Sequence, residues 1–467
     1  MKFIDCKNLK IAYIGGGSRA WARVFMNDLA LEDELGGEIR LYDIDKAAAG
    51  DNEVIGNLIT AMPEAKGKWK YTAIDTLEGA LAGADFVIIS ILPGTFTHMH
   101  SDVHLPERLG IYQSVGDTTG PGGIIRAFRT IPVFEGFAKA IEKICPDAWV
   151  INYTNPMSLC VRTLYTAFPK IKAFGCCHEV FGAQELLASM VRLKTGEKNV
   201  SRSDIHVNVL GLNHFTWFDK ASWKNYELMA MYKDFVDEFY TEGFANDDSG
   251  MPDKCFTCNN RVKFDLFKNY GLIAAAGDRH LAEFISGDIY LKSPKTAESW
   301  GFYLTSVDWR IEDLKRKRDR SKRLVSGEEK VILEPSGEEG ILLIKSLCGL
   351  TRVISNVNLP NTSGQIGNFP KDTVVETNAV FSHNDVRPLY AGNVPENVLE
   401  LMRVHIENQA TVLKAALNYD KEAVCKAFLN DPLVRNSCNG KDVIKLAYDM
   451  LKNTLERRAY ERIVIHE

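Results

Sequence analysis

The sequence lacks several features that would place the protein outside the ordinary soluble enzymes. Its 467 residues contain no apolar run near the roughly 18 residues that a membrane-spanning helix needs. The start lacks the apolar segment of a secretory signal, which predicts a cytoplasmic protein. The 56 basic and 61 acidic residues give a net charge of −5, which argues against nucleic-acid or membrane binding through overall charge. Ten cysteines are too few for a disulfide scaffold, so most are expected to be small core residues.

Two local patterns resemble a nucleic-acid site and a metal or redox site, but neither is complete. The basic run from Lys315 to Arg323 follows acidic residues and contains no aromatics, which favours a solvated helix face over a nucleic-acid site. The motif Cys255-x-x-Cys258 has no second CxxC partner, so it supports neither a zinc ribbon nor a redox site.

Short apolar runs alternate with amphipathic stretches over the first 215 residues. The runs are Lys10–Ile14, Ile39–Tyr42, Lys70–Ile74, Phe86–Leu92, Trp149–Tyr153, Lys172–Cys176 and His206–Leu212. The amphipathic stretches include Ala20–Leu31, Ala47–Ile59, Leu77–Ala82 and Gly123–Ile144. Strands that are apolar on both faces and separated by helices predict a doubly wound, Rossmann-type parallel sheet.

The second half of the chain has a different pattern. Past about residue 220 the alternation fades and helical patterns dominate, at Val262–Tyr270, Glu338–Leu347 and Val398–Leu417. We therefore predict an α/β protein with a Rossmann-type domain over residues 1–205 and an α+β domain over residues 206–467. The second domain is expected to hold substrate and metal and to form the oligomer.

The first βα turn carries a dinucleotide-binding fingerprint. The spacing Gly15-x-Gly17-x-x-Ala20 follows an apolar run and opens a helix, whose N-terminal N–H groups suit a pyrophosphate. The second run ends at Asp43, a carboxylate that would accept bonds from ribose hydroxyls and repel a 2′-phosphate, so NAD is favoured over NADP. The alternative is a structural turn without a ligand. The predicted cofactor-binding residues are Gly15, Gly16, Gly17, Ser18, Asp43 and Asn152.

Polar residues follow the later strands at the edge where ligands bind in such sheets. The glycine-rich loop Gly116–Gly123 follows the fourth run, and Asn152 and Asn155 follow the fifth. Asn155 precedes a proline, which favours extended backbone and would present its amide to a sugar or carboxyl group. A turn that caps the next helix explains Asn155 equally well.

Cysteine and histidine at two strand ends indicate a possible metal site. Cys177, His178 and Glu179 follow the sixth run, and His214 follows the seventh. Two protein ligands would leave positions open for substrate oxygens, as in a catalytic metal site. A buried cysteine and a satisfied histidine are the commoner explanation. The run Gly277–His280 is either part of a site or a polar helix start.

With these motifs together, the sequence resembles glycoside hydrolase family 4. The similar segments are Ile14–Ser18, Gly120–Ile124, Asn152–Pro156, Cys177–Glu179, Gly211–Phe215 and Gln365–Pro370. The version Cys177–Val180, together with Gly277–His280, looks most like the branch that cleaves α-galacturonides. The resemblance implies a lactate/malate dehydrogenase-like C-terminal fold and a homodimer or homotetramer.

The resemblance also implies a redox-assisted elimination. NAD takes a hydride from C3 of the sugar, a base removes the C2 proton, the group at C1 departs, water adds and the hydride returns. A divalent metal, usually Mn²⁺, would polarise the C2 and C3 oxygens. The implied substrates are short oligogalacturonides. The phosphosugar branches carry a Met-Arg pair where this chain has His98-Met99-His100, which argues against a phosphate substrate and fits a different anion or none.

Individual roles follow from matching positions. Cys177 and His214 would bind the metal, and Asn155 would bind the substrate. His178 would be the acid that protonates the leaving oxygen, with Glu179 as the alternative. The C2 base would be Asp278 or His280, of which we favour Asp278. The uronate carboxylate would meet Arg279, His98 or His100.

Three other functions remain open at this point. A neutral-sugar α-glucosidase or α-galactosidase of the same family is the nearest. An NAD-dependent 2-hydroxyacid dehydrogenase is a second, although no Asp–His pair stands in the expected order. A non-catalytic NAD sensor is a third.

Overall fold

The fold is seen in a computed structural model, which describes residues 5–245, 256–435 and 439–454. A nine-stranded sheet with the order β13-β12-β11-β6-β5-β4-β1-β2-β3 forms its centre. Its parallel strands are β1 (Leu9–Ile14), β2 (Gly36–Tyr42), β3 (Lys68–Ala73), β4 (Phe86–Ile89), β5 (Trp149–Asn152) and β6 (Lys172–Gly175). These six strands confirm the predicted α/β class and the doubly wound parallel sheet.

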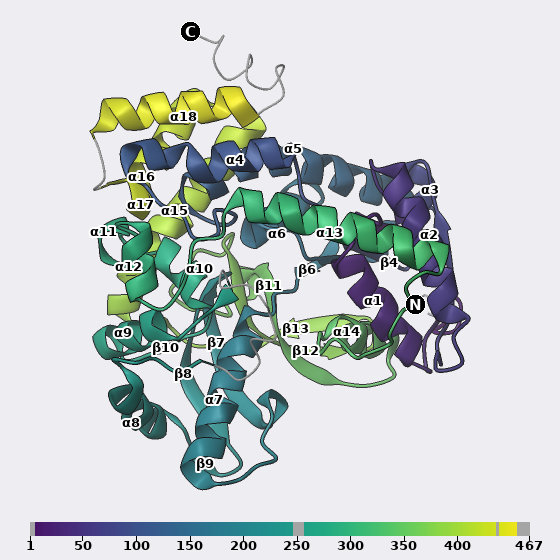
Figure 1. Ribbon diagram of the computed structural model, residues 1–467, viewed down its shortest axis with the longest axis horizontal. Coiled ribbons are helices and arrows are strands. Elements are labelled where there is room, and N and C mark those ends of the chain that lie inside the picture. The colour runs from purple at the N-terminus through teal and green to yellow at the C-terminus, as the bar shows by residue number, and fades with distance from the viewer. Residues whose placement is uncertain (1–4, 246–255, 436–438, 455–467) are drawn as a thin grey trace.

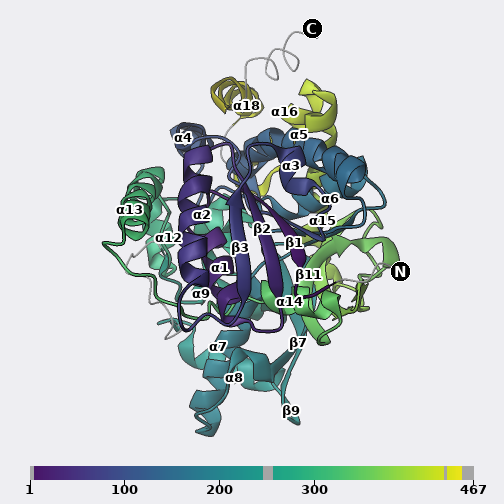
Figure 2. The ribbon, with the colours of Figure 1, turned by 90° about the vertical axis from the view of Figure 1, so that its right-hand side faces the viewer.

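Both faces of this sheet are covered by helices, as Figure 2 shows. Alternate residues of β1 face opposite ways, so that Ile11 packs with α1 (Trp21–Leu31), α2 (Lys46–Thr60) and α14 (Gly340–Cys348), whereas Ala12 packs with α3 (Leu77–Leu81), α5 (Gly120–Ile144) and α6 (Met157–Ala167). Every residue of β4 and β5 is buried. Burial on both faces explains why these strands are continuous apolar runs.

The second half of the chain contributes three strands to the same sheet. They are β11 (Val353–Pro360), β12 (Val374–Ser382) and β13 (Asp385–Pro388), all antiparallel to their neighbours. The large sheet thus crosses the expected domain boundary, and the division at residues 205 and 206 stays a prediction.

A small antiparallel sheet lies beside the large one. It consists of β7 (Ile205–Leu212), β8 (Phe215–Trp223), β9 (Tyr226–Glu227) and β10 (Ile273–Ala274). The run His206–Leu212 therefore forms a strand, but it belongs to this second sheet instead of continuing the parallel one. The Asn378 amide of β12 donates to the Val207 carbonyl oxygen at 2.7 Å, which joins the two sheets.

The remaining helices surround these sheets (Figure 1). They are α4 (Phe96–His104), α7 (Glu179–Thr195), α8 (Met229–Phe239), α9 (Arg261–Tyr270), α10 (Asp278–Glu283), α11 (Gly287–Tyr290), α12 (Pro294–Ser299), α13 (Val307–Ser326), α15 (Glu396–Asn418), α16 (Lys421–Asn430), α17 (Pro432–Arg435) and α18 (Gly440–Thr454). In the part of the chain that the structure describes, none of these helices has the length and apolarity to cross a lipid bilayer. Cys255 lies outside the described residues, and the Cys258 thiol donates to Asn260 Oδ1 at 3.8 Å.

Candidate active site

The glycine loop after β1 leaves no room for side chains. A Cβ on Gly15, whose φ is +94°, would lie 2.0 Å from the Ser90 carbonyl oxygen. A Cβ on Gly16 would lie 2.7 Å from Leu41, and one on Gly17 would lie 2.9 Å from Asp43 Oδ2. The loop therefore requires glycine at all three positions, and its bare backbone N–H groups precede the N-terminus of α1.

Asp43 and Asn52 shape this loop. Asp43 Oδ2 accepts the Gly17 N–H at 2.9 Å, so the carboxylate lies at the rim of the loop, where the sequence predicts contact with a ribose. The fully buried Asn52 amide of α2 donates to the carbonyl oxygens of Gly16 at 2.8 Å and Ser18 at 2.9 Å. The sequence analysis missed Asn52, whose signal is a polar residue on the buried face of an amphipathic helix.

The Asn152 side chain makes its hydrogen bonds within its own turn. Its Nδ2 donates to the Thr154 carbonyl oxygen and to Met157 Sδ, and its Oδ1 accepts the Thr154 N–H. Both amide hydrogens are thus used within the turn after β5. Asn152 therefore has no free side-chain N–H to donate to a cofactor.

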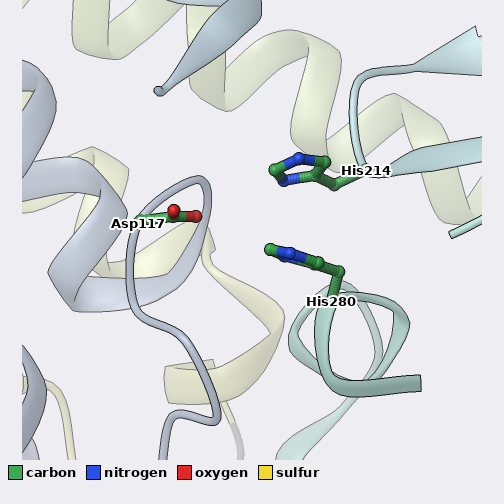
Figure 3. A group of neighbouring side chains, drawn as sticks. All are labelled: Asp117, His214 and His280. Atoms are coloured by element: carbon green, nitrogen blue, oxygen red, sulfur yellow. The ribbon is translucent and has the colours of Figure 1, made fainter. Parts of the chain in front are cut away.

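Three side chains converge beyond the strand ends, as Figure 3 shows. They are Asp117 in the loop before α5, His214 in the β7–β8 turn and His280 on α10, and one potential ligand atom from each lies within 4.8 Å of the others. The two imidazole ring centroids are 3.9 Å apart. Carboxylate and imidazole are ligands that suit a divalent metal such as Mn²⁺.

His214 has an unusual backbone conformation. Its φ of +63° is left-handed, in a two-residue turn between Leu212 and Phe215 where glycine or asparagine would be ordinary. Such strain is typical of functional positions. Thr118 Oγ1 lies 2.8 Å from His214 Nδ1, which leaves Nε2 for a ligand. Burial and then the neighbouring His280 lower the pKa of His214 to about 3, so the imidazole is neutral, the form that binds metals.

Asp117 is held by its loop and by Asn155. Burial by itself would raise the pKa of Asp117, but Arg126, His280 and His214 lower it well below the ordinary value, so the group is a carboxylate. Asn155 Nδ2 donates to Asp117 Oδ2 at 3.2 Å. Among the described residues, Asn155 Oδ1 and His280 Nδ1 are buried without a hydrogen-bond partner, which leaves unused polar atoms at this site. The sequence analysis identified the glycine-rich loop but not Asp117 as its chemically important residue.

The Asp117 loop is fixed from α10. The carboxylate of Glu283, which is 1% exposed, accepts the N–H groups of Val115 at 2.7 Å and Gly116 at 2.9 Å through one oxygen, Oε1. Burial raises the pKa of Glu283 to about 7. Glu283 therefore connects the helix of His280 with the loop of Asp117, a role that the sequence analysis missed.

Cys177 lies behind this group. Its ligand atom is outside the three-residue cluster, beside the Asn213 amide. Burial and then Glu376 and Glu179 raise the pKa of the Cys177 thiol. Buried Glu376 accepts bonds from Asn213 Nδ2 at 3.1 Å and Asn356 Nδ2 at 2.7 Å, which holds the residue that precedes His214.

Glu179 joins the cluster, whereas His178 lies at its outer side. Glu179 Oε1 lies 3.6 Å from His280 Nε2, and Glu179 Oε2 accepts the Gly277 N–H at 2.7 Å. Burial raises the pKa of Glu179, but His280, His214 and His178 lower it to about 2. The exposed His178 ring stacks on Trp21 with centroids 5.5 Å apart, and its Nδ1 lies 3.5 Å from Glu338 Oε1.

The structure does not support the preference for Asp278 as the base. The Asp278 carboxylate is fully buried and accepts the N–H groups of Lys263 at 3.1 Å and Val262 at 3.3 Å, in the first turn of α9. It therefore caps that helix and does not face the cluster. His280, the other residue considered, is the one that lies there.

The predicted carboxylate-binding residues lie on α10 and α4. Arg279 donates to Thr305 Oγ1 at 2.5 Å and covers the Phe256 ring. His98 Nδ1 accepts the Thr95 N–H at 2.9 Å and so takes part in the N-terminal cap of α4. His100 faces a groove between α4 and α13.

Comparison with known proteins decides the family. The model described as "Family 4 glycosyl hydrolase" matches residues 10–193, and the model of its C-terminal domain matches residues 209–434. The α-galacturonidase of Lachnoclostridium phytofermentans is 57% identical over 97% of this chain and 98% of its own length. The chain belongs to glycoside hydrolase family 4. The resemblance predicted from the sequence is thereby confirmed.

Two solved structures have the same fold. The crystal structure of LplD from Bacillus subtilis has a TM-score of 0.90 at 49% identity and covers 95% of this chain and 100% of its own. A 6-phospho-α-glucosidase from gut microorganisms, solved with NAD and Mn²⁺, has a TM-score of 0.80 at 19% identity and covers 96% of this chain and 99% of its own.

Proposed function

We propose that the chain is an NAD- and Mn²⁺-dependent α-galacturonidase that acts on short oligogalacturonides. The observation that carries the proposal is the 57% identity, over nearly the full length of both chains, to an α-galacturonidase. The open glycine loop and the cluster of Asp117, His214 and His280 supply what its chemistry needs. We further propose that the enzyme is cytoplasmic and acts as a homodimer or homotetramer.

The residues of the candidate site fit both NAD and Mn²⁺. The glycine loop and Asp43 fit NAD, and the Asp117 carboxylate with the neutral His214 imidazole fits Mn²⁺, which prefers oxygen and nitrogen ligands. A family member solved with both groups supports this. When bound, NAD accepts the C3 hydride and returns it, and the metal polarises the sugar oxygens.

Each residue of the candidate site then has its own role in the reaction. Asp117 and His214 hold the metal, and Cys177 stays a predicted ligand from the resemblance, since metal binding would displace its thiol proton. Asn155, which touches Asp117, holds a substrate hydroxyl with its unused oxygen. His280 removes the C2 proton, and Glu179, 3.6 Å away, orients it. His178 protonates the leaving oxygen, with Glu338 as its carboxylate neighbour.

A substrate panel tests the proposal. Purified protein with NAD⁺, Mn²⁺ and a reductant should release p-nitrophenol from p-nitrophenyl α-galacturonide and galacturonate from digalacturonate. It should leave the α-galactoside and α-glucoside analogues intact, and NADH absorbance should not accumulate. Inert galacturonides would refute the proposal. Cleavage of a neutral glycoside alone would identify the neutral-sugar activity, and steady NADH formation would indicate a dehydrogenase.

A further inference from the structure

The basic run on α13 has two chemically different faces. On one side Arg316 and Lys317 lie 3.5 and 2.7 Å from the carboxylate of Asp313, one turn earlier on the same helix. Farther along, Arg320 and Arg323 both pair with Glu329. These four cations share two carboxylates of the same segment, as on a solvated helix face.

The other face of the run borders a groove. A hollow of about 810 Å³ lies between α4 and α13, with Lys315, Arg318 and Lys322 on the α13 side and His100 on the α4 side. Lys322 is 3.6 Å from Asp319. Asp319 also lines the groove. Lys315 and Arg318 have no ion-pair partner within the described ranges, so three cations face one carboxylate among the residues that line the groove.

The segment that leads into α13 lies close to the candidate active site. Arg279, the neighbour of His280, donates to Thr305, two residues before α13 starts, and His104 at the end of α4 accepts the Val307 N–H at 3.2 Å. From there α13 runs along the front of the molecule beside α4 and reaches α2 (Figure 1). The groove therefore lies along the helix that starts close to Arg279, the neighbour of His280.

We propose that the groove between α4 and α13 binds the uronate units on the leaving-group side of an oligogalacturonide. The proposal rests on the proposed function. Lys315, Arg318 and Lys322 are spaced by three and four residues, or about 4.5 and 6 Å along one helix face. These distances between cations are of the order of the distance between neighbouring carboxylates in a chain that carries one carboxylate per sugar unit. The cofactor phosphates are the other anions that such cations could meet.

A matched pair of double variants tests the proposal. Lys315→Ala/Arg318→Ala removes the groove cations, and Arg316→Ala/Lys317→Ala removes the same charge from the outer face of the same helix. The ratio of kcat/KM for trigalacturonate to that for p-nitrophenyl α-galacturonide is the readout. We expect the groove variant to lower this ratio about fivefold, as for the loss of two exposed ion pairs, and salt to reduce the difference. The control variant should keep the wild-type ratio.

Three outcomes would overturn the proposal. An unchanged ratio in the groove variant, or an equal drop in the control, would show that the groove does not bind uronates. A weakened Kd for NAD⁺ with equal losses on all substrates would assign the groove to the cofactor phosphates. Wild-type protein that cleaves no galacturonide would refute the proposed function itself, and this proposal with it.

Discussion

Glu283 offers the sharpest test of how the candidate metal cluster is held together. Its single oxygen Oε1 accepts the N–H groups of Val115 and Gly116, directly before Asp117, while His280 lies one turn earlier on the same helix. Glu283→Ala would leave both N–H groups buried without an acceptor. Glu283→Gln keeps an oxygen at the Oε1 position. The glutamine is neutral, like the protonated form of Glu283, and a pKa of about 7 makes that form half populated near pH 7.

The two variants should differ strongly in stability and in metal binding. Each unsatisfied buried N–H costs about 1–3 kcal/mol, so Glu283→Ala should lower the free energy of unfolding by about 4 kcal/mol. The freed loop should also misplace Asp117, and supporting residues of this kind change metal affinity by about 10- to 100-fold. Glu283→Gln should lose less than about 1 kcal/mol and bind Mn²⁺ within about threefold of the wild type.

The measurements are urea unfolding followed by circular dichroism and titration with Mn²⁺ in a calorimeter, under conditions where both variants are folded. The reasoning fails if Glu283→Ala binds Mn²⁺ as the wild type does. It fails equally if Glu283→Gln loses as much affinity as Glu283→Ala, because the charge and not the hydrogen-bond acceptor would then matter.

Three further changes have defined outcomes. Burial raises the pKa of Asp431, which caps α5, from 3.8 to about 7, so its stabilising proton is lost as pH rises through 7. Between pH 4 and pH 8 the free energy of unfolding, measured with urea, should therefore fall less in Asp431→Asn than in the wild type, by on the order of 4 kcal/mol. Gly17→Ala should weaken NAD⁺ binding at least about tenfold in a fluorescence titration, whereas Gly50→Ala, where a Cβ meets nothing within 4 Å, should not. Asp278→Asn should lower the free energy of unfolding by about 1–2 kcal/mol but keep exchange of the sugar C2 hydrogen with solvent deuterium, and His280→Gln should abolish that exchange.

The parallel part of the sheet could be predicted because its constraints are local. Strands such as Phe86–Ile89 are buried on both faces, and that burial is recorded in consecutive apolar residues. The joining of β11 to β6 could not be predicted in the same way. It rests on one antiparallel pairing, between Asn358 and Gly175, and neither segment records its distant partner in its own pattern.

The same distinction applies to the site. The glycine loop was predictable because steric contacts within one βα unit demand the residues Gly15 to Gly17. The cluster, by contrast, brings the loop of Asp117 to a turn 96 residues later in the chain, where Thr118 meets His214. Its members are therefore recognisable only as polar residues in a loop, a turn and a short helix.

The choice between Asp278 and His280 shows what spacing alone leaves open. The two residues are two positions apart on α10, so their side chains point about 200° apart around the helix axis and cannot both face the cluster. The sequence places acid, guanidinium and imidazole in one turn without saying which side of that turn meets the site. The packing of α9 decides it: the first N–H groups of α9 need an acceptor, Asp278 supplies it, and His280 is thereby turned toward Glu179, Asp117 and His214.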